Sequence, residues 1–459
     1  MPQSSFWHRI VPGLALLGVL STTPSALASV TDEGEKVGSV QGIEMKVKHF
    51  TLGNGLRVFV LEDHSTPAFA LHLAFHVGSR DEQAGRTGFA HLFEHMMFKG
   101  SENVPEGGHF KYIEGAGGSL NAFTTADVTQ YHEVVPSHYL DMVLWLESDR
   151  LRSLEVTDDN FENQRQAVQE EKAMRYDNQP YLRSLQEFFA EAWANTGYGH
   201  LTIGSDEDLA AATTGDVQRF FDKHYVPNNA VMAIVGDVEY EEVKRKVDQY
   251  FGDLSRGPDR PAHVAIDHSV SEPFTRTVED KLARQPLYLI GWKTVPRRHP
   301  DYHAVRILMS ALLRGDSSRI TRLLKDDRRM VVASIPTDSM GGGLDAGMSA
   351  GAFVPIPGND FAAIQKVVKA EIAKVKKRGI SSKELQKAQN QLAVDAISQL
   401  ATNNGRASGI AQGALFHDDP THALAELDKY RKVTSRDIKR VANKYLTDNW
   451  LTLEIVPPR

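Results

Sequence analysis

The chain has 459 residues, 41% of them hydrophobic, which is typical of a globular protein long enough to form two or more cores. The formal net charge is −7 without a long basic block, which argues against a nucleic-acid partner. Cysteine is absent, so disulfides contribute nothing and the fold must be stabilised by burial of apolar side chains.

The N-terminal residues 1–28 are predicted to form a secretory signal peptide. Arg9 precedes an apolar run from Ile10 to Leu20, and Ala26-Leu27-Ala28 offers small residues for cleavage. The run has about 11 residues, too few to span a bilayer, although an uncleaved membrane anchor is the alternative. No later segment is apolar enough to cross a membrane, so we expect an exported protein, periplasmic or secreted, without stable membrane insertion.

Strands and helices are expected to mix in the first half of the chain. Asn54-Gly55 predicts a hairpin turn before a strand at 56–61. A helix is expected between Thr87, a suitable N-cap, and Gly100, a suitable C-terminal stop. The other expected strands lie at 68–77, 117–124, 128–135 and 230–235, and the other expected helices at 137–152, 158–176, 181–194 and 240–251.

The order of elements recurs in the second half. Ser255 to Pro261 is rich in proline, glycine and charge, which is typical of a linker. A strand at 287–292, a helix at 302–313 and a strand at 347–354 follow. Residues 223–231 (KHYVPNNAV) resemble residues 443–451 (NKYLTDNWL), which indicates two weakly similar halves unless the likeness arose by chance. Because βαβ alternation is not strict, the predicted class is α+β.

The strongest chemical signal is His91-Leu92-Phe93-Glu94-His95. Residues four apart share one face of a helix, so both imidazoles can reach one ion. Neutral imidazole suits zinc, and a catalytic zinc keeps three protein ligands and a water. Glu94 lies on the same face and could act as a base on that water. The alternative is an amphipathic helix whose polar stripe only meets solvent.

The third ligand is predicted to be Glu171. Glu171 falls near the centre of the apolar stripe of the helix at 158–176, whereas Glu170 points away from it. A carboxylate on a buried face requires a cation or a proton. The alternative is an ion pair between Glu171 and Arg175, four residues further on. The stripe consists of Phe161, Ala167, Val168 and Met174.

These residues carry a family resemblance. His91 to His95 is the inverted zinc motif of the inverzincins, and the chain resembles the pitrilysin, insulin-degrading enzyme and mitochondrial processing peptidase family. In that family a glutamate about 75 residues after the second histidine is the third ligand, and Glu171 follows His95 by 76. The resemblance covers about residues 46–459. Further matches are Gly88-Phe89-Ala90, Phe98-Lys99-Gly100-Ser101, residues 117–124, Asn163-Gln164-Arg165, Tyr198-Gly199-His200, Ile203-Gly204 and residues 225–229.

The resemblance implies two homologous domains, each with a mixed, mostly antiparallel sheet packed with helices, together forming one half of a clamshell. We divide the chain into a signal peptide (1–28), an N-terminal extension (29–45), a catalytic zinc-binding domain (46–256), a linker (257–270) and a non-catalytic domain (271–459). The second domain lacks the motif, because residues 303–307 (HAVRI) occupy the comparable helix. Met330 to Ala333 stand where relatives often have a substrate-gripping tyrosine, which a sister chain could supply.

The resemblance further implies a zinc-dependent endopeptidase that cleaves oligopeptides or unstructured polypeptides. One Zn²⁺ per chain would be bound by His91, His95 and Glu171, with Glu94 as general base. The strand at Asn121, Ala122 and Phe123 would receive substrate as an added β-strand. Gln164 stands where many relatives have a second glutamate and would hydrogen-bond beside the ligands. His132, His200 and Arg319 are expected to be structural.

Two alternatives concern the function, and the assembly is left open. The chain could be a zinc-binding but inactive homologue that serves as a scaffold or partner subunit, although it keeps all four motif residues. It could also hydrolyse a substrate that is not a peptide. Peptide is the expected substrate, and the chain could pair with itself or with a metal-free homologous chain.

Overall fold

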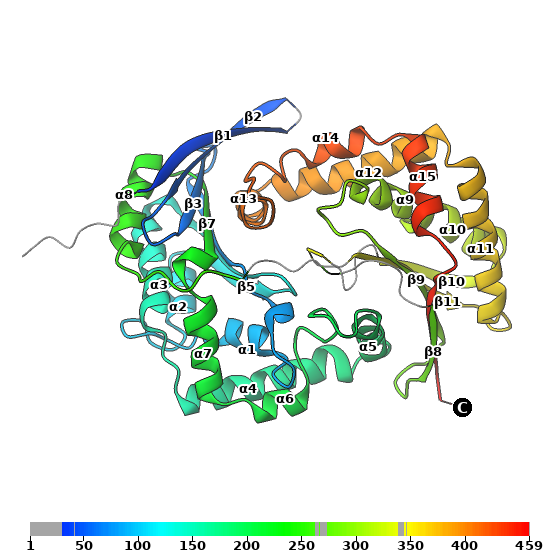
Figure 1. Cartoon of the computed structure of the whole chain (residues 1–459), viewed down its shortest axis with the longest axis horizontal. Helices are drawn as coiled ribbons and strands as arrows, with labels where there is room; N and C mark the ends of the chain where they lie inside the picture. Colours follow the sequence, from blue (N-terminus) through cyan, green and yellow to red (C-terminus); the bar gives the residue numbers. More distant parts are fainter. Residues whose placement is uncertain are drawn as a thin grey trace, which may run out of the picture.

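Two sheets, each covered by helices, form the two sides of the molecule (Figure 1). The structure is a computed structural model that describes residues 30–40, 42–261, 266, 273–337, 344–345 and 347–458. The predicted signal peptide and much of the predicted linker lie outside these residues. The predicted α+β class is confirmed, with one sheet before the predicted linker (the first half) and one after it (the second half).

Within the described residues the first sheet has seven strands in the order β1-β2-β3-β7-β4-β6-β5. Only the β3–β7 pair is parallel. The predicted turn at Asn54-Gly55 joins β2 to β3, where Gly55 has a φ of 93° that favours glycine. β5 lies at the sheet edge. The strands are β1 (Asp32–Val40), β2 (Ile43–Thr51), β3 (Arg57–Glu62), β4 (Ala68–Phe75), β5 (Ser119–Thr124), β6 (Thr129–Pro136) and β7 (Ala230–Gly236).

Helices of the first half cover one face of this sheet. Leu92 and Phe93 of one helix, Leu144 of another and Val247 of a third are buried in the same apolar cluster as the sheet residues. The helices are α1 (Phe89–Met96), α2 (Gly108–Gly115), α3 (Leu140–Ser153), α4 (Asp158–Lys172), α5 (Leu182–Ala192), α6 (Asp206–Ala211), α7 (Thr214–His224) and α8 (Tyr240–Phe251). A π turn over Ala173–Asp177 continues α4.

The second sheet has five strands within the described residues, in the order β10-β11-β9-β12-β8, and only β12 and β8 are parallel. Its strands are β8 (Phe274–Glu279), β9 (Leu287–Thr294), β10 (Val331–Thr337), β11 (Gly347–Pro355) and β12 (Leu451–Val456). Its helices are α9 (Tyr302–Leu313), α10 (Arg319–Arg322), α11 (Phe361–Arg378), α12 (Ser382–Leu400), α13 (Asn403–His417), α14 (Glu426–Arg431) and α15 (Ser435–Tyr445).

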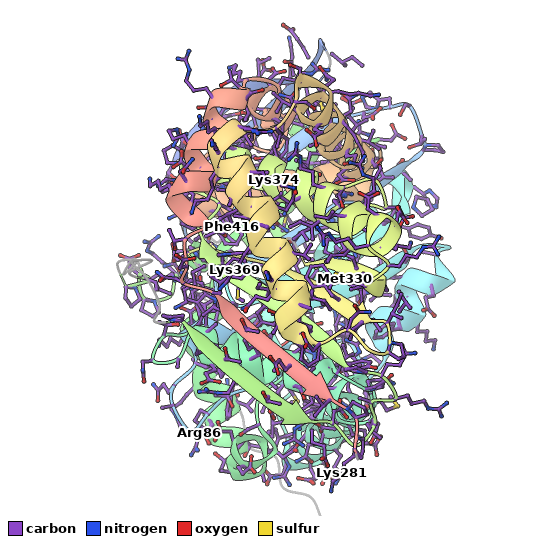
Figure 2. All side chains as sticks on the ribbon, turned by 90° about the vertical axis from the view of Figure 1, so that its right-hand side faces the viewer. Arg86, Lys281, Met330, Lys369, Lys374 and Phe416 are labelled. Atoms are coloured by element: carbon purple, nitrogen blue, oxygen red, sulfur yellow. The ribbon has the colours of Figure 1, made fainter. Side chains whose placement is uncertain are left out.

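The outer face of the second half is formed in part by α11 (Figure 2). Lys369 and Lys374 lie along this exposed side, where the Lys369 ammonium is 5.0 Å from the centre of the Trp450 ring. The opposite side of α11 buries Ile364, Val368 and Ile372 in the second core. In the described part of the chain, no helix combines the length and apolar character needed to span a bilayer.

Each half contributes a helix to the sheet of the other half. α5 of the first half packs on the second sheet, where the ring of Phe188 lies 5.1 Å from that of Phe274. α13 of the second half packs on β4 and β7, and Ile410 joins a buried cluster with Val231 and Val235. The two halves therefore complete one another's cores by burying apolar surface.

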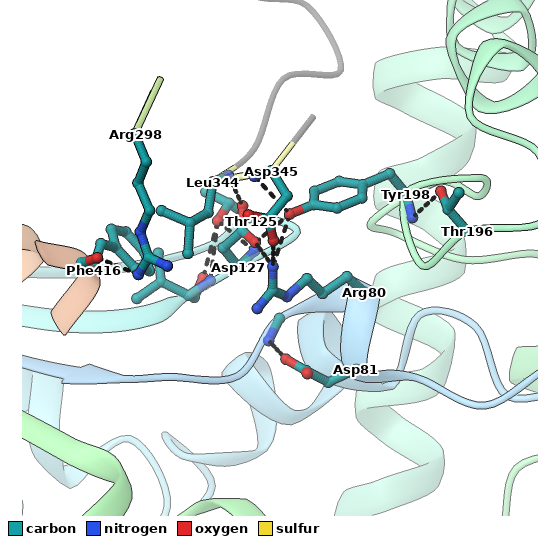
Figure 3. A network of polar contacts seen from close by, with 12 residues as sticks. Arg80, Asp81, Thr125, Asp127, Thr196, Tyr198, Arg298, Leu344, Asp345 and Phe416 are labelled. Carbon is teal, nitrogen blue, oxygen red and sulfur yellow. Dashed lines mark hydrogen bonds and ion pairs between the residues drawn. The ribbon is translucent and has the colours of Figure 1, made fainter. Parts of the chain in front are cut away.

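A buried polar network also joins the halves (Figure 3). The Arg80 guanidinium is 2.8 Å from the Asp127 carboxylate and 2.7 Å from that of Asp345, which belongs to the second half. The Tyr198 hydroxyl donates to Asp127 over 2.6 Å. The arginine between two buried carboxylates compensates for their loss of hydration.

Candidate metal centre

The motif residues lie on α1, a helix held in place by its apolar side. Phe89, Leu92 and Met96 are buried, whereas His91, Glu94 and His95 face a cavity. The expected N-cap at Thr87 is wrong, because the helix begins after Gly88. The Thr87 hydroxyl instead accepts the Ser205 N–H over 3.1 Å and donates to the Asp208 carboxylate over 2.6 Å.

The last turn of α4 brings Glu171 to the two imidazoles. Nε2 of His95 is 3.2 Å from Oε2 of Glu171, and Nε2 of His91 is 3.8 Å from Oε1. One ligand atom from each residue lies within 4.8 Å of the others. Among the residues that the structure describes, this is the only such group of three histidine, aspartate or glutamate side chains.

The charge states at this site suit a divalent cation. Burial lowers the pKa of His91 to about 4, and the neighbouring His95 adds to the shift. The hydrogen bond with His95 lowers the pKa of Glu171 despite partial burial. At neutral pH the site therefore offers a neutral imidazole at His91 and an anionic carboxylate, which are forms that bind zinc.

Glu171 also forms the ion pair with Arg175 that was the alternative to metal binding. The Arg175 guanidinium lies 2.7 Å from Oε1 of Glu171, while Oε2 faces His95. The Arg175 side chain is 67% exposed and can move away from the carboxylate. Met174, assigned to the apolar stripe, is 64% exposed, so the stripe ends before the π turn.

Glu94 is oriented by a residue that the sequence analysis missed. The Thr124 hydroxyl donates to Oε2 of Glu94 over 2.5 Å. Burial raises the pKa of Glu94, and the hydrogen bond from Thr124 opposes this shift. Thr124 stands 30 residues from Glu94 in the chain, and its only sequence signal was its place at the end of the expected substrate strand.

A cavity of about 750 Å³ joins the metal-ligand candidates to β5. Asn121, Ala122 and Phe123 line it beside His91, His95 and Glu171. In the described residues β5 pairs with β6 alone, so its other edge has no strand partner. Oδ1 of Asn121 accepts the Ala122 N–H over 2.8 Å. The polar cluster therefore lies beside an unpaired strand edge.

Of the other residues discussed from the sequence, Gln164 lines this cavity, whereas His132, Arg319 and His200 do not. The Gln164 amide donates to Asn163 over 2.7 Å. His132 stacks on His72 with ring centres 4.8 Å apart. Arg319 forms ion pairs with Glu371 and Glu384 in the second half. His200 lies 2.9 Å from the carboxylate of Glu82.

α9 of the second half, whose residues 303–307 correspond to the motif of α1, contributes to no such cluster among the described residues. His303 of α9 lies 3.0 Å from the carboxylate of Glu426 on α14. Their ligand atoms do not gather with a third donor as those of the first half do. This agrees with the absence of the His-x-x-Glu-His motif from the second half.

Comparisons with known proteins point in the same direction. Residues 57–206 match the family model described as insulinase (peptidase family M16), and residues 211–392 match the model of the peptidase M16 inactive domain. The zinc protease PqqE of Helicobacter pylori is 28% identical over 420 residues, which cover 90% of this chain and 93% of that protein.

Two further relatives extend the comparison. The crystal structure of a protease from Helicobacter pylori superposes with a TM-score of 0.81 at 26% identity, covering 93% of this chain and all of that one. A probable mitochondrial-processing peptidase subunit beta of Arabidopsis thaliana is 24% identical over 89% of this chain and 78% of that protein. The similarity therefore spans both halves.

Proposed function

The chain belongs to the M16 family of peptidases, and we propose that it is a zinc-dependent endopeptidase acting on oligopeptides or unstructured polypeptides. One observation carries the proposal. His91, His95 and Glu171 meet in a cavity that also contains Glu94 and an unpaired strand edge. A metal-binding cluster, a carboxylate base and a place for an extended chain are what peptide hydrolysis requires.

The donor set fits zinc. Two imidazoles and one carboxylate form a known set of protein ligands at catalytic zinc centres, which leave a position open for water. His91, His95 and Glu171 would hold one ion per chain. When bound, the ion would supply Lewis acidity to water and to the scissile carbonyl group. Arg175 would release Glu171, because the guanidinium is largely exposed and water can solvate it once it moves away.

Glu94 would move the protons of the reaction. Its carboxylate would accept a proton from the attacking water and later deliver it to the leaving amine. Burial raises the pKa of Glu94 and so brings this pKa closer to neutral pH, which suits a general base. The hydrogen bond from Thr124 would keep the carboxylate turned towards the cavity.

β5 would bind the substrate as an additional strand. Main-chain hydrogen bonds at Asn121, Ala122 and Phe123 would fix an extended peptide with little selection of its sequence. The Ala122 N–H would first leave Oδ1 of Asn121, so that it could bind a substrate carbonyl. Gln164 would contribute a hydrogen bond at the wall of the same cavity.

The second candidate function is that of an inactive, zinc-binding scaffold or partner subunit. One relative is named as a subunit of a processing peptidase, and the second half matches an inactive-domain model. The retention of His91, Glu94, His95 and Glu171 favours the enzyme. We also propose a homodimer or a heterodimer with a metal-free homologue, and export to a periplasm or the medium, which residues 1–28 support.

The test compares the wild-type protein with its Glu94→Gln variant. Both should contain one zinc per chain. The wild type should cleave a peptide library, and the activity of the variant should be about 10²–10⁴-fold lower. Glu170→Gln, which removes an exposed carboxylate of α4 outside the cavity lining, should keep activity. Full activity of Glu94→Gln would contradict the mechanism. A zinc-loaded wild type without peptidase activity would support the scaffold.

A further inference from the structure

The helix that carries the motif begins at a residue without a capping side chain. Gly88 has a φ of 90°, and a Cβ there would lie 2.6 Å from the carbonyl oxygen of Ile203. A Cβ on Gly204 would likewise lie 2.5 Å from the carbonyl oxygen of Thr87. Only glycine fits at this N-cap, so the free N–H groups of the first turn need an acceptor from elsewhere in the chain.

Glu82 provides this acceptor. Its carboxylate accepts the N–H of Gly88 over 2.9 Å and that of Ala90 over 2.8 Å. The Glu82 side chain is fully buried. Negative charge at this end of a helix also interacts favourably with the helix dipole. Ala90 directly precedes His91, so Glu82 fixes the turn that carries the first imidazole.

His200 links Glu82 to the second helix of the site. Nε2 of His200 lies 2.9 Å from Oε2 of Glu82. His200 is the first residue of the segment 200–208, which we call the brace. In the brace, Asp208 accepts the Thr87 N–H over 2.9 Å just before α1. Asp206 accepts a hydrogen bond from Lys172 over 2.9 Å, and Lys172 directly follows Glu171 in α4. The brace therefore contacts both ligand-bearing helices.

We propose that Glu82 and His200 are positioning residues for the metal centre. Through the brace they hold His91 and His95 at a fixed place relative to Glu171, so that the three donors are assembled before the ion arrives. This inference rests on the proposed function, because it assumes that these donors bind zinc. Groups that orient metal ligands typically change metal affinity or activity 10–100-fold when they are replaced.

The experiment measures zinc affinity of metal-free protein by competition with a chromogenic chelator, together with the melting temperature. Glu82→Gln keeps the size of the side chain and should weaken zinc binding about tenfold or more, with a lower kcat and a similar KM. His200→Gln leaves the acceptor for α1 in place and should weaken binding less than Glu82→Gln does. It also tests the inference if Glu82→Gln does not fold.

Glu426→Gln is the matched control. Glu426 and His303 form a glutamate–histidine pair in the second half whose geometry is similar to that of Glu82 and His200, and the variant removes its carboxylate. It should lower the melting temperature without changing zinc affinity. If the wild type takes up no zinc, the proposed function fails. If the wild type binds zinc and the Glu82 and His200 variants bind it as tightly as Glu426→Gln does, the positioning role is contradicted and the pair only stabilises the fold.

Discussion

The hydroxyl of Thr124 donates to the carboxylate of Glu94 over 2.5 Å, which joins β5 to the motif helix α1. Thr124 ends β5, whose preceding residues line the cavity, and Glu94 lies between the two histidines of α1. One hydrogen bond thus relates the side chain proposed as base to the strand proposed to hold the peptide. A substrate that shifts β5 would also move the base.

Replacing Thr124 by valine should lower kcat while zinc content stays unchanged. The variant keeps the shape of the side chain but loses a hydrogen bond to a carboxylate, which is worth about 1.5–3 kcal/mol. We expect a decrease in kcat of about ten- to hundredfold in a peptide-cleavage assay. The control is Thr277→Val in the second sheet. Thr277 lies on β8 and its hydroxyl donates to Glu454 on β12, so this variant loses a similar hydrogen bond and should leave kcat unchanged. Unaltered turnover in Thr124→Val would show that Glu94 needs no such support.

Replacing Arg175 by glutamine should tighten zinc binding. The guanidinium contacts Oε1 of Glu171 and competes with a cation for the same carboxylate. Because Arg175 is largely exposed and screened, we expect an increase in affinity of only about three- to tenfold at low salt. Arg183→Gln removes a comparable exposed partner from Glu187 and should have no effect. Weaker zinc binding in Arg175→Gln would mean that the arginine orients Glu171 instead.

Replacing Arg80 by methionine should destabilise the contact between the halves. Asp127 and Asp345 would then remain buried without a cation, a change that typically costs about 3–5 kcal/mol. Chemical denaturation should show this loss as a lower midpoint. Arg276→Met is the control, because it breaks an exposed pair with Glu191 that also joins the halves and should cost at most about 1 kcal/mol. Equal losses would show that burial of the network is unimportant.

The stability of the protein should fall with pH below about 6.5, partly through His72. Burial and then the neighbouring His132 lower the pKa of His72 to about 3. Between these two pKa values the unfolded chain binds a proton at His72 and the folded protein does not. The contribution of His72 to the free energy of unfolding is therefore fully present above the unfolded pKa and is lost as pH falls. At pH 5.5 the loss should be about 1.4 kcal/mol.

The measurement compares wild type and His72→Gln by denaturation at pH 7.5 and 5.5. Glutamine cannot titrate in this range, so the variant should lose less stability on acidification than the wild type. The comparison isolates His72 from other histidines because these are shared by both proteins. The same loss in both proteins would contradict the assignment.

The amino-acid sequence was sufficient where the physical rule is local. His91, Glu94 and His95 share a face because four residues make about one helical turn. Glu171 could be found because the apolar stripe around it pointed to a buried side, and α4 does bring it to the histidines. The boundaries of α8 and α9 also followed from periodicity, as both match the expected ranges.

Contacts between distant residues were beyond such rules. Thr87 is a residue type that favours an N-cap, but its hydroxyl accepts the Ser205 N–H and donates to Asp208. His200 was expected to be structural, and the sequence could not show that its partner Glu82 accepts hydrogen bonds from α1. An amphipathic helix must bury its apolar side, but its pattern does not specify against which sheet.

By itself, the sequence determined the α+β class, the family, and the three side chains proposed to bind zinc, because these depend on short-range periodicity and on motif spacing. Only the tertiary structure decided that α5 and α13 cross to the opposite sheets, that Thr124 faces Glu94, and that Glu82 takes the place of a cap on α1. Such contacts arise when elements far apart in the chain pack together, and the free energy of that packing belongs to the whole core.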